Sequence, residues 1–388
     1  MFDIATLPPR PADPLLALIG SFRSDPRVKK IDLGVGVYRN CEGRTPVMAA
    51  VKAAERLLVD RQSSKAYLGP EGDLGFVTAI ADLIFTSADG LAHRRGVQTP
   101  GGAGALRLAA ELLAESGVGR IHAAAPTWPN HAAVFQAAGL TLETTSVFDL
   151  KAQTLNGEAW IAALETAPEG DAVLLHGCCH NPTGLDLSPA LWAATTEVIA
   201  RRNLLPVIDL AYLGLGKDLD ADGAGMRLLL RQIPYALIAV SCDKNFGLYR
   251  ERTGALFVQA PTATRSASLM TNLCALARAN WSMPPDHGAA IVRTILEDPA
   301  LKKNWKTELQ AMQTRIAGVR SALAATSPQL SGLREGRGMF ANLAVSSEQV
   351  QRLKTEHAVY MAGSGRINLA GLSDSSLPIF ADALRAVS

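Results

Sequence analysis

The sequence predicts an α/β protein, with a mostly parallel sheet in a large domain and a smaller α+β domain beside it. Three observations lead to this fold class. Short apolar runs alternate with stretches of helical periodicity, as a parallel sheet requires. The apolar runs end in polar residues, which is typical of strands that carry a site at their carboxyl ends. The chain has 388 residues, more than one hydrophobic core usually holds, so two domains are expected.

The first element is a short docking helix in an N-terminal segment, residues 1–45, that we assign to the smaller domain. Asp13 and Pro14 form a good N-cap and first-turn pair. The helix itself is indicated by apolar side chains at helical spacing, namely Leu15, Leu18, Ile19 and Phe22. Residues 31–38 are then expected to be extended, and their glycines would let the backbone approach a ligand closely.

The large domain is expected over residues 46–298. Within it, glycines at 101, 102 and 104 open a helix that Gly117 would end. Unpaired backbone N–H groups at such a helix start, together with the helix dipole, can hold an anion such as a phosphate. A plain glycine-rich turn packed on a strand explains the same residues equally well.

Four apolar runs predict buried strands of the large domain. They cover residues 120–125, 172–176, 205–209 and 236–240. Ser188 and Pro189 begin a helix between the second and the third of them. Because the carboxyl ends of parallel strands meet at one edge of a sheet, the polar residues that follow these strands should lie together.

The smaller domain is expected to comprise residues 299–388 as well as the N-terminal segment. A long amphipathic helix begins near Pro299, because apolar residues recur at steps of three and four as far as Leu323. Strands are predicted over 338–343 and 366–370. Ser346 and Gln349 form a capping box at the start of one helix, and a final helix begins near Ser375.

Composition excludes several classes of function. A net charge of +2, with 19% charged and 48% hydrophobic residues, favours a globular protein without a nucleic-acid or membrane partner. No apolar run reaches membrane-spanning length and no leader pattern opens the chain, so a cytoplasmic protein is expected. The cysteines are too few and too irregular for a disulfide framework or a zinc site, and no metal site is predicted. They are Cys41, Cys178, Cys179, Cys242 and Cys274.

Lys244 stands at the centre of the predicted chemistry, in the stretch SCDKNFGLYRER over 241–252. It follows a buried strand, so its amine arrives at the ligand-binding edge of the sheet. A lysine that bonds covalently to an aldehyde must be unprotonated for part of the time, which requires burial or a nearby cation. Arg252 could be that cation, or could clamp a phosphate. Taken alone, both residues also fit surface charges on a loop.

Other polar residues at the strand ends suit a pyridine ring. Asp209 could keep a ring nitrogen protonated, and Trp128 offers a flat face for stacking. Asn181 and Tyr212 could hydrogen-bond a phenolate oxygen of the same ring. Each has a structural alternative, because Trp128 could fill the core, Asp209 could cap a helix and Asn181 could serve a turn before Pro182.

These residues also carry a family resemblance. The motifs TWPNH (127–131), HNPTG (180–184), DLAY (209–212), SCDKNFGLY (241–249) and GRINLAG (365–371) occur in an order and at a spacing that are highly specific. With them the chain resembles the class I aminotransferases of the fold-type I pyridoxal-phosphate superfamily, closest to the aspartate and aromatic amino-acid branch. The resemblance extends from the first helix to the C-terminus. It implies a seven-stranded sheet with helices on both faces, pyridoxal 5'-phosphate as cofactor and a homodimer with shared active sites.

The resemblance implies a role for each motif residue. Lys244 would bond to the cofactor and move a proton during catalysis, with Asp209 on the pyridine nitrogen and His131 supporting Asp209. Trp128 would stack on the ring, while Asn181 and Tyr212 would contact its oxygen. The phosphate would be held by residues of the glycine-rich turn and the lysine loop, with Tyr67 from the other subunit. Those residues are Gly101, Gly102, Ala103, Ser241 and Arg252.

The implied reaction passes an amino group from aspartate or an aromatic amino acid to 2-oxoglutarate by a ping-pong mechanism. Arg366 would grip the substrate α-carboxylate, with Gly36 closing over it and Trp128 and Asn181 lining the same pocket. Arg278 would bind a distal carboxylate across the dimer interface, or swing away for an aromatic ring. An interfacial salt bridge is the alternative role for Arg278. Two alternative functions are another reaction of the same cofactor, such as β-elimination or decarboxylation, and a sensor that binds the cofactor without catalysis.

Two positions depart from the family pattern. Ala103 stands where relatives usually place a phosphate-binding threonine, and Asp243 stands where they usually place a serine. A lost hydrogen bond and a carboxylate near a phosphate both predict weakened cofactor retention, the first by about 1.5–3 kcal/mol. An outward-turned Asp243 would have no such effect.

Overall fold

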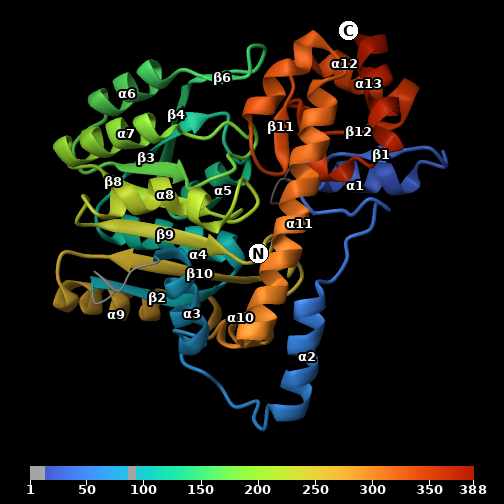
Figure 1. Cartoon of the computed structure of the whole chain (residues 1–388). Coiled ribbons are helices and arrows are strands. Elements are labelled where there is room, and N and C mark those ends of the chain that lie inside the picture. Colours follow the sequence, from blue (N-terminus) through green and yellow to red (C-terminus); the bar gives the residue numbers. More distant parts are fainter. Residues whose placement is uncertain (1–13, 86–92) are drawn as a thin grey trace, which may run out of the picture.

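The computed structural model describes residues 14–85 and 93–388. Its largest element is a mixed sheet of seven strands (Figure 1). Across the sheet the strands follow in the order β2 (Arg94–Pro100), β10 (Thr253–Gln259), β9 (Ala236–Ser241), β8 (Leu205–Leu210), β7 (Ala172–His176), β3 (Arg120–Ala125) and β4 (Thr141–Ser146). Only β10 runs antiparallel to its neighbours, while the other four pairs are parallel. The mostly parallel seven-stranded sheet is therefore confirmed.

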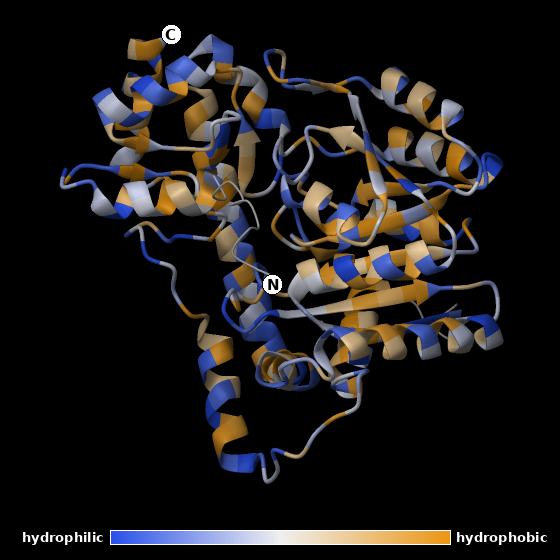
Figure 2. Ribbon diagram, turned by 180° about the vertical axis from the view of Figure 1, so that it is seen from behind, coloured by the Kyte–Doolittle hydropathy of each residue, from blue (hydrophilic) through white to orange (hydrophobic). Residues whose placement is uncertain are grey.

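Helices cover both faces of this sheet, because alternate residues of each strand enter two separate hydrophobic clusters. In β8 and β9, Val207 and Ala239 belong to one cluster, and Ile208 and Ile238 belong to the other. The first cluster includes residues of α4 (Gly101–Glu115), α5 (Asn130–Gln136) and α9 (Ala263–Trp281). The second includes residues of α2 (Ala49–Arg61), α3 (Leu74–Phe85), α6 (Gly157–Thr166), α7 (Pro189–Arg201), α8 (Leu219–Leu230) and α10 (His287–Glu297). The strands between these layers are largely apolar (Figure 2).

A third buried cluster joins Ile31 and Leu33 to the C-terminal part of the chain. The parallel pair β1 (Ile31–Asp32) and β12 (Val359–Tyr360) joins the N-terminal segment to the C-terminal part, and β11 (Phe340–Asn342) pairs with β13 (Arg366–Asn368). Around these strands lie α1 (Pro14–Ser24), α12 (Ser347–His357) and α13 (Ser376–Val387), shown in blue and red in Figure 1. The capping box at Ser346 is confirmed, whereas the expected N-cap Asp13 lies outside the described residues.

The long helix α11 (Pro299–Ala324) packs in both regions. Its side chains from Leu301 to Ile316 join the cluster of the large sheet, and Val319 and Leu323 join the C-terminal cluster. The helix therefore connects two cores rather than lying in one of them. Two further short elements are the hairpin of β5 (Phe148–Asp149) with β6 (Thr154–Leu155) and the 3₁₀ helix η3 (Pro328–Glu335).

One predicted strand was wrong in its length. The strand expected over 366–370 ends at Asn368, and residues Leu369–Gly371 form a 3₁₀ turn. The cause is local, because the Asn368 side chain accepts a hydrogen bond from the Ala370 N–H and so offers the backbone a turn in place of a ladder. Within the ranges 14–85 and 93–388, no helix is long and apolar enough to cross a bilayer.

Candidate active site

The polar residues that follow β3, β7, β8 and β9 gather at one edge of the sheet, as the alternation of strands and helices predicted. Asp209 lies at the end of β8 and Ser241 at the end of β9. The Lys244 Nζ lies 5.5 Å from the centre of the Tyr212 ring, so the residues that follow these two strands converge. The site is therefore built by the topology of the sheet.

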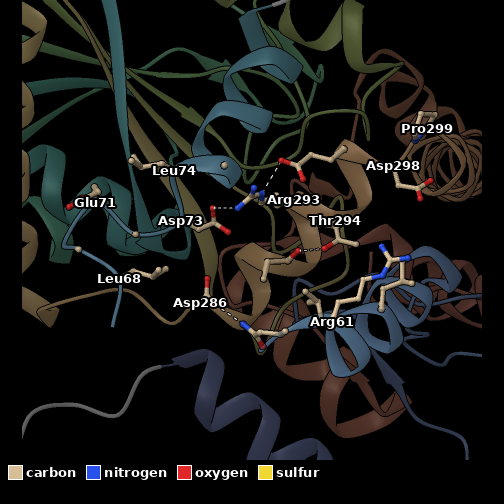
Figure 3. A pocket seen from close by; sticks show the side chains of 18 residues that line it. Arg61, Leu68, Glu71, Asp73, Leu74, Asp286, Arg293, Thr294, Asp298 and Pro299 are labelled. Carbon is tan, nitrogen blue, oxygen red and sulfur yellow. Dashed lines mark hydrogen bonds and ion pairs between the residues drawn. The ribbon is translucent and has the colours of Figure 1, made fainter. Parts of the chain in front are cut away.

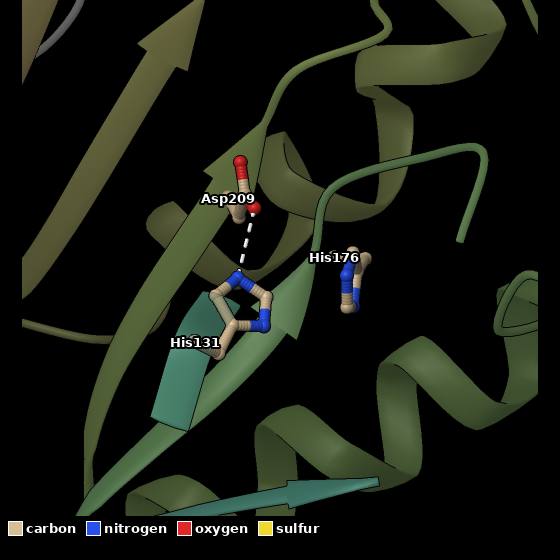
Figure 4. Close-up of side chains that lie close together, drawn as sticks. All are labelled: His131, His176 and Asp209. Carbon is tan, nitrogen blue, oxygen red and sulfur yellow. Dashed lines mark hydrogen bonds and ion pairs between the residues drawn. The ribbon is translucent and has the colours of Figure 1, made fainter. Parts of the chain in front are cut away.

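A buried carboxylate and imidazole form one end of the site, which we call the ring end (Asp209, His131, Thr127). The His131 Nε2 lies 3.1 Å from the Asp209 Oδ2, and since a carboxylate can only accept, the imidazole donates there (Figure 4). The His131 Nδ1 lies 2.8 Å from the Thr127 hydroxyl. Burial opposes charge on Asp209, but the hydrogen bond from His131 and the nearby positive charges outweigh it and lower the pKa of Asp209. Asp209 is thus held as a carboxylate.

The residues of TWPNH reach Asp209 because α5 begins only a short loop after β3, which ends at Ala125. The helix carries His131 under Asp209, and His131 is fully buried. Trp128 packs edge-on against His131 with ring centres 5.1 Å apart, and it is half-buried at the side of the first hydrophobic cluster. The His176 ring, from the end of β7, lies 5.4 Å from the His131 ring. Aromatic side chains therefore pack around His131, the hydrogen-bond partner of Asp209.

Lys244 lies between the two ends of the site. Burial lowers the pKa of its ammonium group, and the carboxylates of Asp243 and Asp209 act in the opposite direction. The Asp243 Oδ2 lies 3.9 Å from the Lys244 Nζ. A lysine in this environment loses its proton more readily than an exposed one, which is what a nucleophilic amine requires.

Asn181 and Tyr212 lie beside the lysine and contact each other. The Asn181 Nδ2 donates to the Tyr212 hydroxyl oxygen at 3.2 Å. The Asn181 Oδ1 is buried and has no hydrogen-bond partner among the described residues. Burial also raises the pKa of Tyr212, so its hydroxyl remains a donor at neutral pH. The pair therefore presents polar atoms that can hydrogen-bond a ligand.

The start of α4 and the lysine loop form the other end of the site, the anion end (Gly101, Gly102, Ala103, Ser241, Arg252). Gly101 has a φ of +73°, and a Cβ at this position would lie 2.5 Å from the Arg252 Nη2. A Cβ at Gly102 would lie 2.9 Å from the Ser241 Cβ. Only glycine therefore lets the helix start approach these side chains.

Asp243 occupies the same end of the site. Its side chain is buried and its Oδ2 forms an ion pair with the Arg252 Nη1. The outward orientation that sequence reasoning left open for Asp243 is therefore wrong. The charge-assisted hydrogen bond from the Arg252 guanidinium holds the carboxylate in this inward orientation.

Arg366 enters the site from the C-terminal region. It is buried, its Nη2 donates to the Gly34 carbonyl at 2.8 Å, and burial lowers the pKa of its guanidinium. Its Nε is buried without a partner among the described residues. The guanidinium lies 4.9 Å from the centre of the Phe340 ring, and a Cβ at Gly36 would lie 2.9 Å from the Phe340 Cζ. Gly36 and Arg366 are thus neighbours of one aromatic ring.

Sequence reasoning did not assign Phe340 to the site. Its ring packs edge-on against Tyr212 at 5.8 Å and also lies under Arg366, so it joins the C-terminal region to the sheet edge. The strand around it was predicted, and a large aromatic residue on a short strand was the only available signal. An aromatic residue in such a strand usually fills a core, so its position could not be inferred.

The family model that describes aminotransferase class I and II matches residues 28–384. The chain belongs to this aminotransferase family. It is 52% identical over 376 residues to a tyrosine aminotransferase of Rhizobium meliloti, with 96% of each chain covered. A solved aromatic amino acid aminotransferase with 3-indolebutyric acid superposes over 100% of both chains, with 42% identity and a TM-score of 0.96. The aromatic-amino-acid aminotransferase of Burkholderia pseudomallei, covalently bound to pyridoxal phosphate, matches over 100% of both chains with 34% identity and a TM-score of 0.96.

The aminotransferase is pyridoxal-phosphate dependent, as its family is, and its residues fit that group. The donors of Asn181 and Tyr212 suit the ring oxygen, and the ionised Asp209 suits the ring nitrogen. The glycines of α4 leave room for a phosphate beside Arg252 and Ser241. The anion end fits less well than the ring end, because Ala103 offers no hydroxyl and Asp243 already pairs with Arg252.

Two predicted site residues do not join this cluster within the single chain. Tyr67 is 93% exposed and Arg278 is exposed near the end of α9. Neither side chain has a hydrogen bond or ion pair with any residue of 14–85 or 93–388. The roles expected for them across a dimer interface therefore stay predictions.

Proposed function

We propose that this aminotransferase moves the amino group of an aromatic amino acid or aspartate to 2-oxoglutarate. One observation carries the proposal, which is the position of Arg366. Its buried guanidinium has an Nε without a partner among the described residues, and Phe340, which it covers, packs on Tyr212 beside Lys244. A carboxylate that binds there is held by a cation and a directed donor, as the α-carboxylate of an amino acid requires. Aromatic-amino-acid and aspartate aminotransferases among the relatives support these two donor classes.

The residues divide the work of the reaction. When bound, pyridoxal phosphate supplies the electron sink that lets an amino acid lose its α-proton. Lys244, with its lowered pKa, would accept that proton from the α-carbon and deliver it to the C4′ carbon of the cofactor. Asp209 would keep the ring nitrogen protonated, and Asn181 with Tyr212 would bind the ring oxygen. In a ping-pong order, the first 2-oxo acid leaves before the second one binds.

The ring end also resembles a metal site in its spacing. The donor atoms of His131, His176 and Asp209 lie within 4.8 Å of one another (Figure 4). Family membership favours the pyridine nitrogen as the partner of Asp209, because its Oδ2 is already taken by His131 and its other oxygen remains for one donor. We therefore propose no metal in the reaction.

We propose a homodimer in which Tyr67 and Arg278 complete the partner's site. Apolar side chains stand exposed on α2 and at the start of α3, the two helices on either side of Tyr67 in the sequence, among them Val59 at 83% and Leu74 at 55%. The adjoining pocket, lined by α2, α10 and the segment between α2 and α3, is open in the single chain (Figure 3). A second copy of the chain would cover these side chains. Sedimentation of the purified protein tests this, and a monomer at micromolar concentration contradicts it.

We also propose that residues 1–45 and 299–388 form a smaller domain that closes on the substrate, with Arg366 as its contact. The separate C-terminal cluster supports this division, and α11 would be the element along which the domain moves. The protein is proposed to act in the cytoplasm.

The covalent bond is tested first. Purified apoprotein mixed with pyridoxal phosphate should develop a visible absorption band that borohydride removes. Lys244→Ala should develop none, because it lacks the amine to which the bond is assigned. A band of equal strength in Lys244→Ala would contradict the proposal.

The donor class is tested with a panel of amino acids and 2-oxoglutarate as acceptor. Arg278→Leu should lower kcat/KM for aspartate by roughly 10²-fold or more, since a bidentate contact to a carboxylate is lost. Phenylalanine should lose far less. Equal losses for both donors would remove Arg278 from the substrate pocket.

A further inference from the structure

Arg252 is already occupied within the chain. Its Nη1 pairs with the Asp243 Oδ2 and lies 3.3 Å from the Tyr249 carbonyl. Its Nη2 faces the position that a Cβ of Gly101 would take, which puts the guanidinium against the first turn of α4. The cation that the anion end offers to a phosphate therefore has a carboxylate on one side and a helix start on the other.

The carboxylate of Asp243 is held in this place by burial and by its neighbours. Its residue is 3% exposed, and its backbone N–H donates to the Ser241 hydroxyl at 3.3 Å. Its Oδ1 is buried without a partner among the described residues, so the pair with Arg252 and the more distant Lys244 are the main compensation for its charge. A buried charge with one unpartnered oxygen is costly. The carboxylate would gain from any further donor, and a phosphate dianion brings none.

The charges at the anion end cancel before any ligand binds. Arg252 contributes one positive charge and Asp243 one negative charge, and among residues 14–85 and 93–388 only Lys244 makes a further ion pair with either of them. An incoming phosphate keeps the attraction of the α4 N-terminus, but must share Arg252 with Asp243. Ala103 adds no hydroxyl that could offset this competition.

We propose that Asp243 is a built-in competitor of the cofactor phosphate for Arg252. It occupies the guanidinium when the phosphate is absent and weakens phosphate binding when it is present. The aminotransferase therefore holds its cofactor as an exchangeable ligand, and discriminates less between phosphorylated and unphosphorylated pyridoxal. This inference rests on the proposed function, since it assumes that Lys244 binds the aldehyde of the same molecule.

The test measures dissociation constants of pyridoxal phosphate and of pyridoxal from the apoprotein, by the growth of the visible band. Asp243→Ser removes the carboxylate, and Asp243→Asn removes only its charge and keeps its volume. Asp171→Ser is the matched control, because Asp171 also pairs with a half-exposed arginine, Arg120 at 3.2 Å, but stands at the start of β7 on the opposite edge of the sheet. Thermal unfolding of the apoproteins with and without inorganic phosphate is the second readout.

Both Asp243 variants should bind pyridoxal phosphate at least about tenfold more tightly than the wild type, and pyridoxal about equally. Phosphate should raise the Tm of these variants more than that of the wild type or Asp171→Ser. Unchanged pyridoxal-phosphate affinity in folded Asp243→Ser and Asp243→Asn would overturn the inference. So would an equal gain for pyridoxal, because Asp243 would then act through Lys244. Absence of the visible band in every protein would instead refute the proposed function.

Discussion

The ring end and the anion end of the site share one sheet edge but differ in how their charges are satisfied. At the ring end, Asp209 is buried, receives a hydrogen bond from His131 and keeps a lowered pKa. At the anion end, the Arg252 side chain is 43% exposed and its partner is a carboxylate of its own loop. The negative charge of Asp209 at the ring end can therefore pair with a ligand. The positive charge of Arg252 at the anion end is already neutralised by Asp243.

This difference separates two tasks of a cofactor site. In the proposed function, the fixed carboxylate at the ring end would set the protonation of the ring and so control the reaction. The anion end would bind only the phosphate of the cofactor, so it could be weakened without changing the chemistry. The two ends should therefore respond to substitution in different quantities, the ring end in turnover and the anion end in cofactor affinity.

The largest effect is expected for Asp209→Asn. A carboxamide has the shape of the carboxylate but cannot hold a proton on the ring nitrogen by charge, so kcat should fall by roughly 10²–10³-fold. Steady-state kinetics at saturating pyridoxal phosphate measures this. A fall in cofactor affinity that accounts for the whole loss would remove the contrast between the two ends.

Arg252→Met should have the next largest effect, and this effect should be on cofactor affinity rather than on turnover. Loss of the guanidinium removes charge-assisted hydrogen bonds to the phosphate, so the dissociation constant of pyridoxal phosphate should rise about 10–100-fold. Absorbance titration of the apoprotein gives this constant. With the cofactor saturating, kcat should stay much closer to wild type than in Asp209→Asn, and a comparable collapse of kcat would contradict the division.

Ala103→Thr should restore part of the anion end. A hydroxyl on the first turn of α4 can donate to the phosphate, and in a partly exposed site this is worth about 1 kcal/mol, or roughly fivefold in affinity. The same titration measures it, with Ala103→Val as the control of equal shape. If valine improves the affinity as much as threonine, packing rather than the hydroxyl is responsible.

The smallest expected effect is on the pH dependence of folding stability, and it comes from His180, a buried residue near the ring end. Burial lowers the pKa of His180 well below its ordinary value near 6.5, and its Nε2 has no partner among the described residues. The unfolded chain therefore takes up a proton that the folded chain does not, and this contribution to stability is lost as the pH falls below about 6.5. The urea midpoint should fall more between pH 7 and pH 5 in the wild type than in His180→Gln. If the urea midpoints of the two proteins fall equally with pH, His180 titrates alike in the folded and the unfolded state, and the prediction is wrong.

Many of the strands, helix starts and caps of this protein could be predicted from local sequence patterns. The strands that carry Asp209 and Lys244 are short apolar runs, and the glycines of α4 and the Ser346 capping box are local signals that the structure confirms. These features depend on residues a few positions apart, so the sequence alone determines them. The strand expected beyond Asn368 does not form, and the cause is again local. The Asn368 side chain accepts a hydrogen bond from the Ala370 N–H, and this turns the backbone.

The tertiary structure decided which of these residues meet. Phe340 lies under Arg366 and against Tyr212, three residues from different parts of the chain whose contact no spacing predicts. The orientation of Asp243 was open in the sequence, because a loop carboxylate can face water or a neighbour with little local preference. The approach of Arg252 to the first turn of α4 settled it, and that approach exists only because β9 and β10 pair beside that helix. Local preference fixes the elements, whereas long-range packing and charge fix their partners.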